Sequence, residues 1–223
     1  MNEIRPIQWA DGKLNLLDQT RLPGEEVTIQ ATSYEDAVDS IREMRVRGAP
    51  AIGVTAAYAV VLAARDLDIS NRDDFLSGLA EAAVRINAAR PTAVNLRWAV
   101  QRMIAVAEST TDTAAIKERL LAEAVLIQEE DEAINRRMGS HGKELMPDGG
   151  SVLTHCNTGA LATSAFGTAL GVIRAGWEDG KRFQVFNTET RPWLQGARLT
   201  SWEFQKLGIP ATLLVDSAAG MLM

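Results

Sequence analysis

Cysteine is almost absent from this sequence, with Cys156 the only one among 223 residues. A lone cysteine excludes an internal disulfide, and no secretory apolar segment follows the opening residues MNEIRPIQW. Both features predict a reducing, cytoplasmic setting. No metal-ligand spacing, P-loop or dinucleotide-binding fingerprint occurs either, so we expect neither a metal ion nor another cofactor.

Long apolar runs and an excess of positive charge are also lacking. The longest apolar run, Ala51 to Ala64, is too short to span a bilayer, so we expect a buried helix there and no membrane segment. A net charge of −6 argues against binding to nucleic acid or an anionic membrane, since either would need a basic face. Local positive charge can still bind a small anion.

The pattern of residues 1–146 predicts a mostly helical domain with a small β lead-in. The expected segments are strands over 7–17, turned at Asp11-Gly12, and 26–32, then helices over 33–45, 51–65, 71–90, 95–108 and 112–138. Ser33 and Asp36 have the spacing of a capping box, which predicts the start of the first helix.

Residues 147–223 have a different period and predict a second domain, with Pro147 to Gly150 as the boundary. Short apolar runs at 151–155, 183–186 and 211–215 alternate with helical segments, which is typical of βαβ units and a parallel sheet. The predicted fold class is therefore α/β. Cys156, Asn187 and Asp216 are each expected to follow a strand, at the sheet edge where open α/β sheets bind ligands.

Cys156 is the leading candidate for chemistry. It precedes residues 157–159 and a helix expected near Ala160, where free backbone N–H groups and the positive end of a helix dipole would favour a reactive thiolate. The alternative is an inert cysteine packed in the core, as free cysteines often are. Neighbouring strand residues face opposite ways, so a simple pair with His155 is not expected unless the strand has already ended.

Two arginines and one polar loop could bind a ligand. Arg47 and Arg90 each lie at a helix break beside a proline, where a guanidinium could contact a phosphate, and Gly48 would let a ligand approach the backbone closely. Each arginine could equally be a surface or packing residue. The segment from Glu189 to Gly196 is either a ligand loop at the sheet edge or a turn with a helix cap.

Four motifs are distinctive: LDQTRLP at 17–23, RGAPAIG at 47–53, THCNTGALAT at 154–163 and ETRPWLQGARLTSWE at 189–203. Together they resemble the methylthioribose-1-phosphate isomerases, within a wider family that includes initiation-factor exchange subunits and ribose-1,5-bisphosphate isomerases. The resemblance covers essentially the whole chain. It implies a helical N-terminal domain and a Rossmann-like C-terminal domain.

The resemblance also implies residue roles and a reaction. Cys156 stands at the family's catalytic cysteine. The positions that match substrate-binding residues are Arg47, Gly48, Ala49, Arg90 and Gln195. The implied reaction converts 5-methylthioribose 1-phosphate to 5-methylthioribulose 1-phosphate in methionine salvage, in a homodimer. The alternatives are an isomerase of ribose 1,5-bisphosphate or 5-deoxyribose 1-phosphate, or a non-catalytic regulatory subunit of the initiation-factor exchange type.

One departure from the family pattern concerns its catalytic aspartate. The family has that aspartate in a GADRI-like motif, followed by an asparagine-lysine pair, and neither occurs in the 223 residues. Asp216 matches an earlier aspartate. The last apolar segment, 218–223, would also leave the sheet unfinished. We therefore expect a chain truncated at its C-terminus, with a partial Rossmann-like domain and no turnover of its own.

Overall fold

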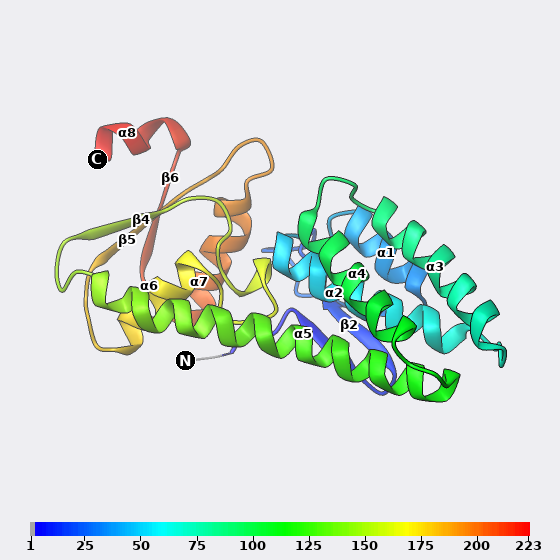
Figure 1. Cartoon of the computed structure of the whole chain (residues 1–223). Helices are drawn as coiled ribbons and strands as arrows, with labels where there is room; N and C mark the ends of the chain where they lie inside the picture. Colours follow the sequence, from blue (N-terminus) through cyan, green and yellow to red (C-terminus); the bar gives the residue numbers. More distant parts are fainter. Residues whose placement is uncertain (1–2) are drawn as a thin grey trace. The chain divides into compact units, whose positions relative to one another are not determined.

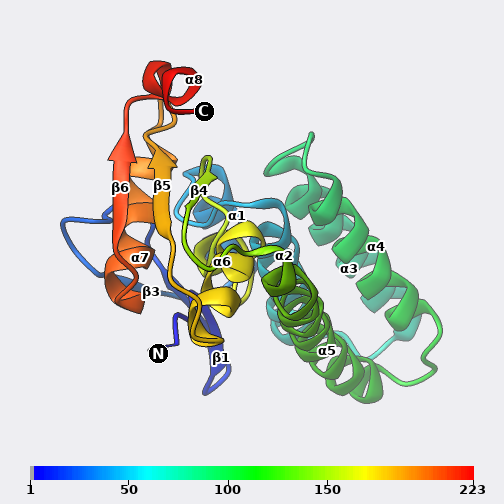
Figure 2. The same ribbon diagram turned by 90° about the vertical axis from the view of Figure 1, so that its left-hand side faces the viewer.

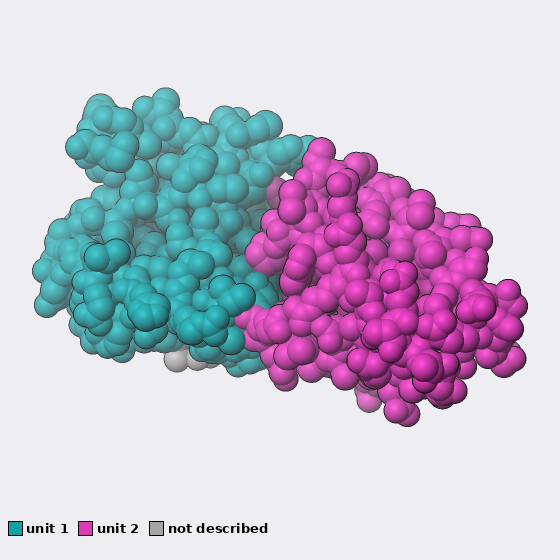
Figure 3. Space-filling view, in the orientation of Figure 1, with its two compact units in different colours: residues 1–6, 21–26, 131–223 teal, residues 7–20, 27–130 magenta. Residues whose placement is uncertain are grey.

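The computed structural model describes residues 3–223, which form two compact units (Figures 1 and 3). The helical unit consists of Ile7–Thr20 and Val27–Glu130, and the sheet unit of the residues up to Pro6, Arg21–Glu26 and Asp131–Met223. The predicted α/β class, with a helical region and a small β lead-in before a parallel sheet, is confirmed. The division into domains at 146/147 remains a prediction.

A three-stranded antiparallel sheet opens the helical unit. It consists of β1 (Ile7–Ala10), β2 (Lys13–Leu17) and β3 (Thr28–Ala31), in that order. Asp11 and Gly12 both have positive φ, which is the geometry of a two-residue hairpin turn that follows the twist of the strands. Leu14 and Leu16 are fully buried, whereas Lys13, the first residue of β2, is exposed, so one face of the ribbon lies on the core.

Five helices follow the small sheet. They are α1 (Tyr34–Arg42), α2 (Ala49–Asp66), α3 (Arg72–Ala88), α4 (Val94–Glu108) and α5 (Thr113–Gly142). Ser33 and Asp36 form the predicted capping box at the start of α1. Every residue of α2 from Ala51 to Ala64 is buried, so this helix is the centre of the unit, as its uninterrupted apolar run predicted. Helix α5 continues past Glu130 into the sheet unit.

The sheet unit contains a parallel sheet of β4 (Ser151–Thr154), β5 (Gln184–Thr188) and β6 (Ala211–Leu214), with β5 in the middle. Figure 2 shows β5 and β6 side by side. The other elements are α6 (Ala169–Glu178), α7 (Ser201–Leu207), α8 (Ala219–Leu222), the 3₁₀ turns η1 (Lys143–Leu145), η2 (Ala160–Ala162) and η4 (Asp216–Ala218), and the π-helix η3 (Gly196–Thr200). The strands and helices alternate as predicted.

Two predicted details of this unit are wrong. The helix expected near Ala160 is only the three-residue turn η2, and the next α-helix begins at Ala169. Asn187 does not follow a strand but lies within β5, where its side chain is 1% exposed. Its amide donates to the carbonyl of Gly196 and to Ser201 Oγ, both at 3.1 Å, so it anchors the start of η3.

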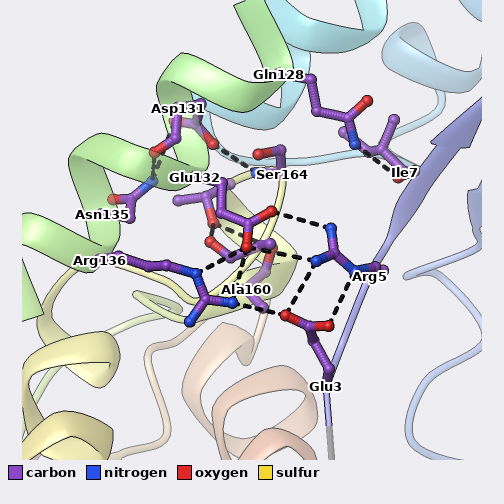
Figure 4. Close-up of polar contacts among 12 residues, drawn as sticks. Glu3, Arg5, Ile7, Gln128, Asp131, Glu132, Asn135, Arg136, Ala160 and Ser164 are labelled. Carbon is purple, nitrogen blue, oxygen red and sulfur yellow. Dashed lines mark hydrogen bonds and ion pairs between the residues drawn. The ribbon is translucent and has the colours of Figure 1, made fainter. Parts of the chain in front are cut away.

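A charged network ties the first described residues to α5 (Figure 4). Glu132 accepts from Arg5 at 3.0 Å and from Arg136 at 2.7 Å, and Arg136 also pairs with Glu3 at 2.6 Å. Single exposed ion pairs contribute about 0–1 kcal/mol, and linking several charges makes each one more effective. The segment before β1 is thereby held on the sheet-unit part of α5.

Candidate functional site

Cys156 lies in a strained turn immediately after β4. Its φ of 65° is in the left-handed region, which costs a residue with a side chain about 1–3 kcal/mol unless its surroundings enforce it. Two threonines do so: the Cys156 N–H donates to Thr190 Oγ1 at 3.0 Å, and Thr200 Oγ1 donates to the Cys156 carbonyl at 2.5 Å. Cys156 is half-buried rather than enclosed in the core.

The residues that follow β5 and β6 support this turn. Thr190 is itself left-handed, with φ of 62°, and its N–H and that of Arg191 both donate to the Asp216 carboxylate at 2.8 Å. These bonds from Arg191 and Thr190 lower the pKa of Asp216 below its usual range. The segments after all three parallel strands therefore meet at one edge of the sheet, as predicted for Cys156 and Asp216.

His155 takes part through a different contact. Its Nδ1 lies 2.6 Å from Thr188 Oγ1, which in turn lies 3.3 Å from Thr190 Oγ1. Strand β4 ends at Thr154, before His155, so the opposite-face argument against a cysteine–histidine pair does not apply here. The imidazole is nevertheless engaged by a threonine hydroxyl of β5.

Gln195 is half-buried at the start of η3, directly before a glycine that is sterically required. A Cβ at Gly196 would overlap the carbonyl oxygen of Thr188. The absence of a side chain there lets the start of η3 approach the end of β5. This close approach fixes the position of Gln195, the residue directly before η3.

Glu203 is a residue that sequence reasoning missed. Its carboxylate is fully buried and accepts the N–H of Ala160 at 2.6 Å, the N–H of Leu161 at 3.3 Å and the side-chain amide of Asn157 at 2.8 Å. Burial raises the pKa of Glu203 to about 7, an effect opposed by these hydrogen bonds and by the positive charge of Arg174. The backbone N–H groups that were expected to be free beside Cys156 are thus occupied by a carboxylate.

The sequence did contain one signal for this burial. Glu203 lies between Trp202 and Phe204, and all three residues are buried on α7. A glutamate flanked by two large apolar residues does not fit a solvated helix face, although that pattern alone does not name its partners.

The predicted phosphate residues belong to the helical unit. Gly48, with φ of 95°, precedes α2 and Ala49 begins it, while half-buried Arg47 lies just before them. Arg90, also half-buried, lies in the connection from α3 to α4. A Cβ at Gly53 would lie 3.1 Å from the Asn95 carbonyl oxygen, so α2 and α4 touch near their N-terminal ends. Both arginines therefore precede helices whose first turns are adjacent.

Other features of the described residues do not add to this site. Within residues 3–223 no group of three or more histidine, cysteine, aspartate or glutamate side chains is placed to hold a metal ion, and no helix is long and apolar enough to cross a membrane. A cavity of about 600 Å³ lies between α7 and β6, lined by Phe204, Ile209 and Leu213 among others, but none of the predicted site residues lines it.

The model of the Initiation factor 2 subunit family matches residues 45–223. The chain belongs to this family. The methylthioribose-1-phosphate isomerases of Geotalea uraniireducens and Geobacter metallireducens are each 52% identical to it over 222 residues, covering 99% of this chain and 64% of theirs. The resemblance inferred from the four motifs is therefore confirmed.

Two solved structures are also similar. The 5-methylthioribose 1-phosphate isomerase of Pyrococcus horikoshii is 37% identical with a TM-score of 0.92, covering 98% of this chain and 62% of that one. The delta subunit of translation initiation factor eIF-2B from A. fulgidus is 44% identical with a TM-score of 0.90, covering 98% of this chain and 64% of that one. The chain thus spans slightly less than two thirds of the length of these relatives.

Proposed function

We propose that this protein isomerises 5-methylthioribose 1-phosphate to 5-methylthioribulose 1-phosphate, an aldose–ketose conversion in methionine salvage. The observation that carries the proposal is the 52% identity, over 99% of the chain, to proteins of that name. A cysteine held in a strained turn at the ligand edge of a parallel sheet supports it, because such positions are typical of catalytic groups.

In this proposal Cys156 moves the proton. The phosphate on C1 blocks the free aldehyde that ordinary aldose–ketose isomerases use, so the sugar ring must first open with help from an acid. The Cys156 thiolate then takes the proton from C2, and the resulting thiol returns a proton to C1. The C2 hydroxyl becomes the carbonyl by giving its proton to the group that opened the ring, which restores that acid. The rival chemistry is a hydride shift from C2 to C1, in which the cysteine only shapes the site.

Substrate binding is assigned to the residues that match the family's substrate-binding positions. Arg47 and Arg90 contact the phosphate, since guanidinium groups bind phosphate through paired hydrogen bonds. Gly48 and Ala49, at the start of α2, and Gln195, directly before η3, are the other proposed substrate-binding positions. The homodimer and the cytoplasmic location are proposed along with the activity; light scattering coupled to gel filtration tests the dimer.

The substrate is tested with protein expressed from the whole open reading frame that contains this sequence. It is incubated in turn with 5-methylthioribose 1-phosphate, ribose 1,5-bisphosphate and 5-deoxyribose 1-phosphate, and ketose formation is followed by NMR. We expect the highest kcat/KM for the methylthio sugar. A higher value for either other sugar would transfer the assignment to that isomerase, and no turnover of any would refute an isomerase.

The role of Cys156 is tested by isotope and by substitution. In D₂O the shuttle places solvent deuterium at C1 of the product, whereas a hydride shift leaves the substrate hydrogen there. Cys156→Ser should lower kcat about 10²–10⁴-fold with little change in KM, because a hydroxyl is a far poorer base. Ser217→Ala, at an exposed position of the same unit, is the matched control. Near-normal turnover by Cys156→Ser would remove the cysteine from the mechanism.

A second candidate function is a non-catalytic subunit of the initiation-factor type. The observation that favours it is the 44% identity to the eIF-2B delta subunit from A. fulgidus. Against it, the chain has a cysteine, two arginines and a glutamine at the positions expected of the isomerase. Turnover in the three-sugar assay separates the two, since a regulatory subunit would have none.

A further inference from the structure

Glu203 has no part in the proposed reaction, yet it bonds the segment that follows the reacting cysteine. Its two carboxylate oxygens receive three donors from residues 157–161: Oε2 accepts from Ala160 N, and Oε1 accepts from Leu161 N and Asn157 Nδ2. The segment wraps the carboxylate so closely that a Cβ at Gly159 would overlap it. A buried carboxylate with this many donors from one segment fixes the path of that segment.

The helical segment that carries Glu203 also bonds Cys156 itself, through Thr200. Thr200, three residues before Glu203 and hence on the same helical face, donates to the Cys156 carbonyl at 2.5 Å and accepts from Asn157 Nδ2 at 3.4 Å. Asn157 therefore links the two helix residues to the turn. The left-handed Cys156 is therefore fixed at its own carbonyl by Thr200, and the residue directly after it is fixed by Glu203.

We propose that Glu203 is a positioning residue for Cys156: by holding Asn157 and the amides of Ala160 and Leu161, its carboxylate fixes the turn that presents the thiol. This inference rests on the proposed function only in taking Cys156 as the reacting group. The hold is strongest when the carboxylate is ionised, because both oxygens then accept. Protonation converts one of them into a donor and releases part of the segment.

The neighbours of Glu203 place this change near neutral pH. Burial raises its pKa to about 7 while Arg174, on α6, acts in the opposite direction. Arg174 itself pairs with Glu178 at 2.8 Å and lies 4.8 Å from the ring of Phe166. The other titratable groups beside the cysteine turn are His155, which contacts Thr188 at the end of β5, and Asp216, which accepts from Thr190 in the loop after it.

The test uses the reactivity of the thiol, which needs no isomerase activity. Because Cys156 is the only cysteine in the 223-residue chain, the rate of alkylation by iodoacetamide reports on it alone. The rate is measured from pH 5 to 9 for the unmodified chain, Glu203→Gln, Asn157→Ala and the control Glu26→Gln. Glu26 is an exposed carboxylate that pairs with Lys206, which lies on α7 together with Glu203. Circular dichroism at each pH establishes folding.

The expected profile of the unmodified chain rises with thiolate formation and has a second inflection near pH 7. That inflection should be lost in Glu203→Gln, lost or reduced in Asn157→Ala, and retained in Glu26→Gln. If the unmodified chain has no second inflection, or if Glu203→Gln retains it, the inference is wrong. If Asn157→Ala keeps it in full, the carboxylate acts through its charge and not by positioning, which also overturns the inference. Should Glu203→Gln fail to fold, Asn157→Ala decides.

These outcomes are separate from those of the proposed function. A protein with no turnover of any sugar but with the predicted alkylation profiles would refute the isomerase and keep the positioning role. An active isomerase in which the unmodified chain and the three variants have the same alkylation profile would keep the isomerase and refute the positioning role.

Discussion

Replacing Glu203 by glutamine should change how stability depends on pH. The folded protein raises the pKa of this carboxyl from its usual 4.5 to about 7 by burying it, whereas the unfolded chain restores the usual value. Between these two pH values the folded state holds a proton that the unfolded state has lost. The free energy of unfolding therefore falls as pH rises through this window, and levels off above it.

The size of the fall follows from the two pKa values. Each tenfold difference in proton affinity between the two states corresponds to about 1.4 kcal/mol, so a rise from 4.5 to about 7 removes roughly 3 kcal/mol. That is a large fraction of the ~5–15 kcal/mol by which domains are usually stable. Glutamine does not titrate, so the Glu203→Gln chain should lack this contribution entirely.

The measurement is urea unfolding at intervals from pH 4.5 to 8.5, followed by tryptophan fluorescence and circular dichroism. Subtracting the unfolding free energy of Glu203→Gln from that of the unmodified chain removes the contribution of all other titrating groups. As pH rises from 4.5 to about 7, the unmodified chain should lose roughly 3 kcal/mol of stability relative to the variant. Glu26→Gln is the control. Its pairing with Lys206 lowers the pKa of Glu26, so its curve should run parallel to that of the unmodified chain within this window.

A constant difference between the two curves from pH 4.5 to 7 would refute the reasoning. It would mean that Glu203 ionises in the folded protein as it does in the unfolded chain, and the pH-dependent part of the positioning role would fail with it.

Two further predictions concern the loop and the phosphate. Gly196→Ala should destabilise the sheet unit by about 2–4 kcal/mol in urea unfolding, because the new Cβ would overlap the Thr188 carbonyl. The control Gly24→Ala should be nearly neutral, since its Cβ would lie 3.7 Å from the nearest neighbour, and equal effects of the two substitutions would contradict the close approach. In the protein from the whole open reading frame, Arg47→Ala should raise KM about tenfold or more, because a phosphate contact is lost. The control is Arg42→Ala, at an exposed position of α1, which should leave KM unchanged. An unchanged KM for Arg47→Ala would refute the phosphate contact.

Most of the fold could be predicted from the sequence because its signals are local. The hairpin turn at Asp11-Gly12 and the capping box of Ser33 and Asp36 each depend on residues within a few positions of one another, and the structure contains both. The apolar run from Ala51 to Ala64 similarly predicts a buried helix without knowledge of its partners. Local patterns determine these elements before tertiary packing does.

The site was only partly predictable, since its key contacts join distant residues. Parallel topology was enough to bring Cys156 and Asp216 to one sheet edge. It could not show that the amide of Ala160 is bonded by Glu203, 43 positions away, in place of starting an α-helix. A carboxylate at the first amides of a turn satisfies them as a helix cap would, so no longer helix is needed to order the segment.

The same contacts give a physical reason why two of the four motifs occur together. The segment 154–163 supplies the cysteine turn, and the segment 189–203 supplies the groups that shape it. Thr190 accepts from the Cys156 N–H, Thr200 donates to its carbonyl, and Glu203 binds the residues that follow. Neither segment has the hydrogen-bond partners to hold a left-handed cysteine by itself. A substitution of Thr190, Thr200 or Glu203 that spares the fold should therefore alter the reactivity of the Cys156 thiol by changing the backbone that carries it.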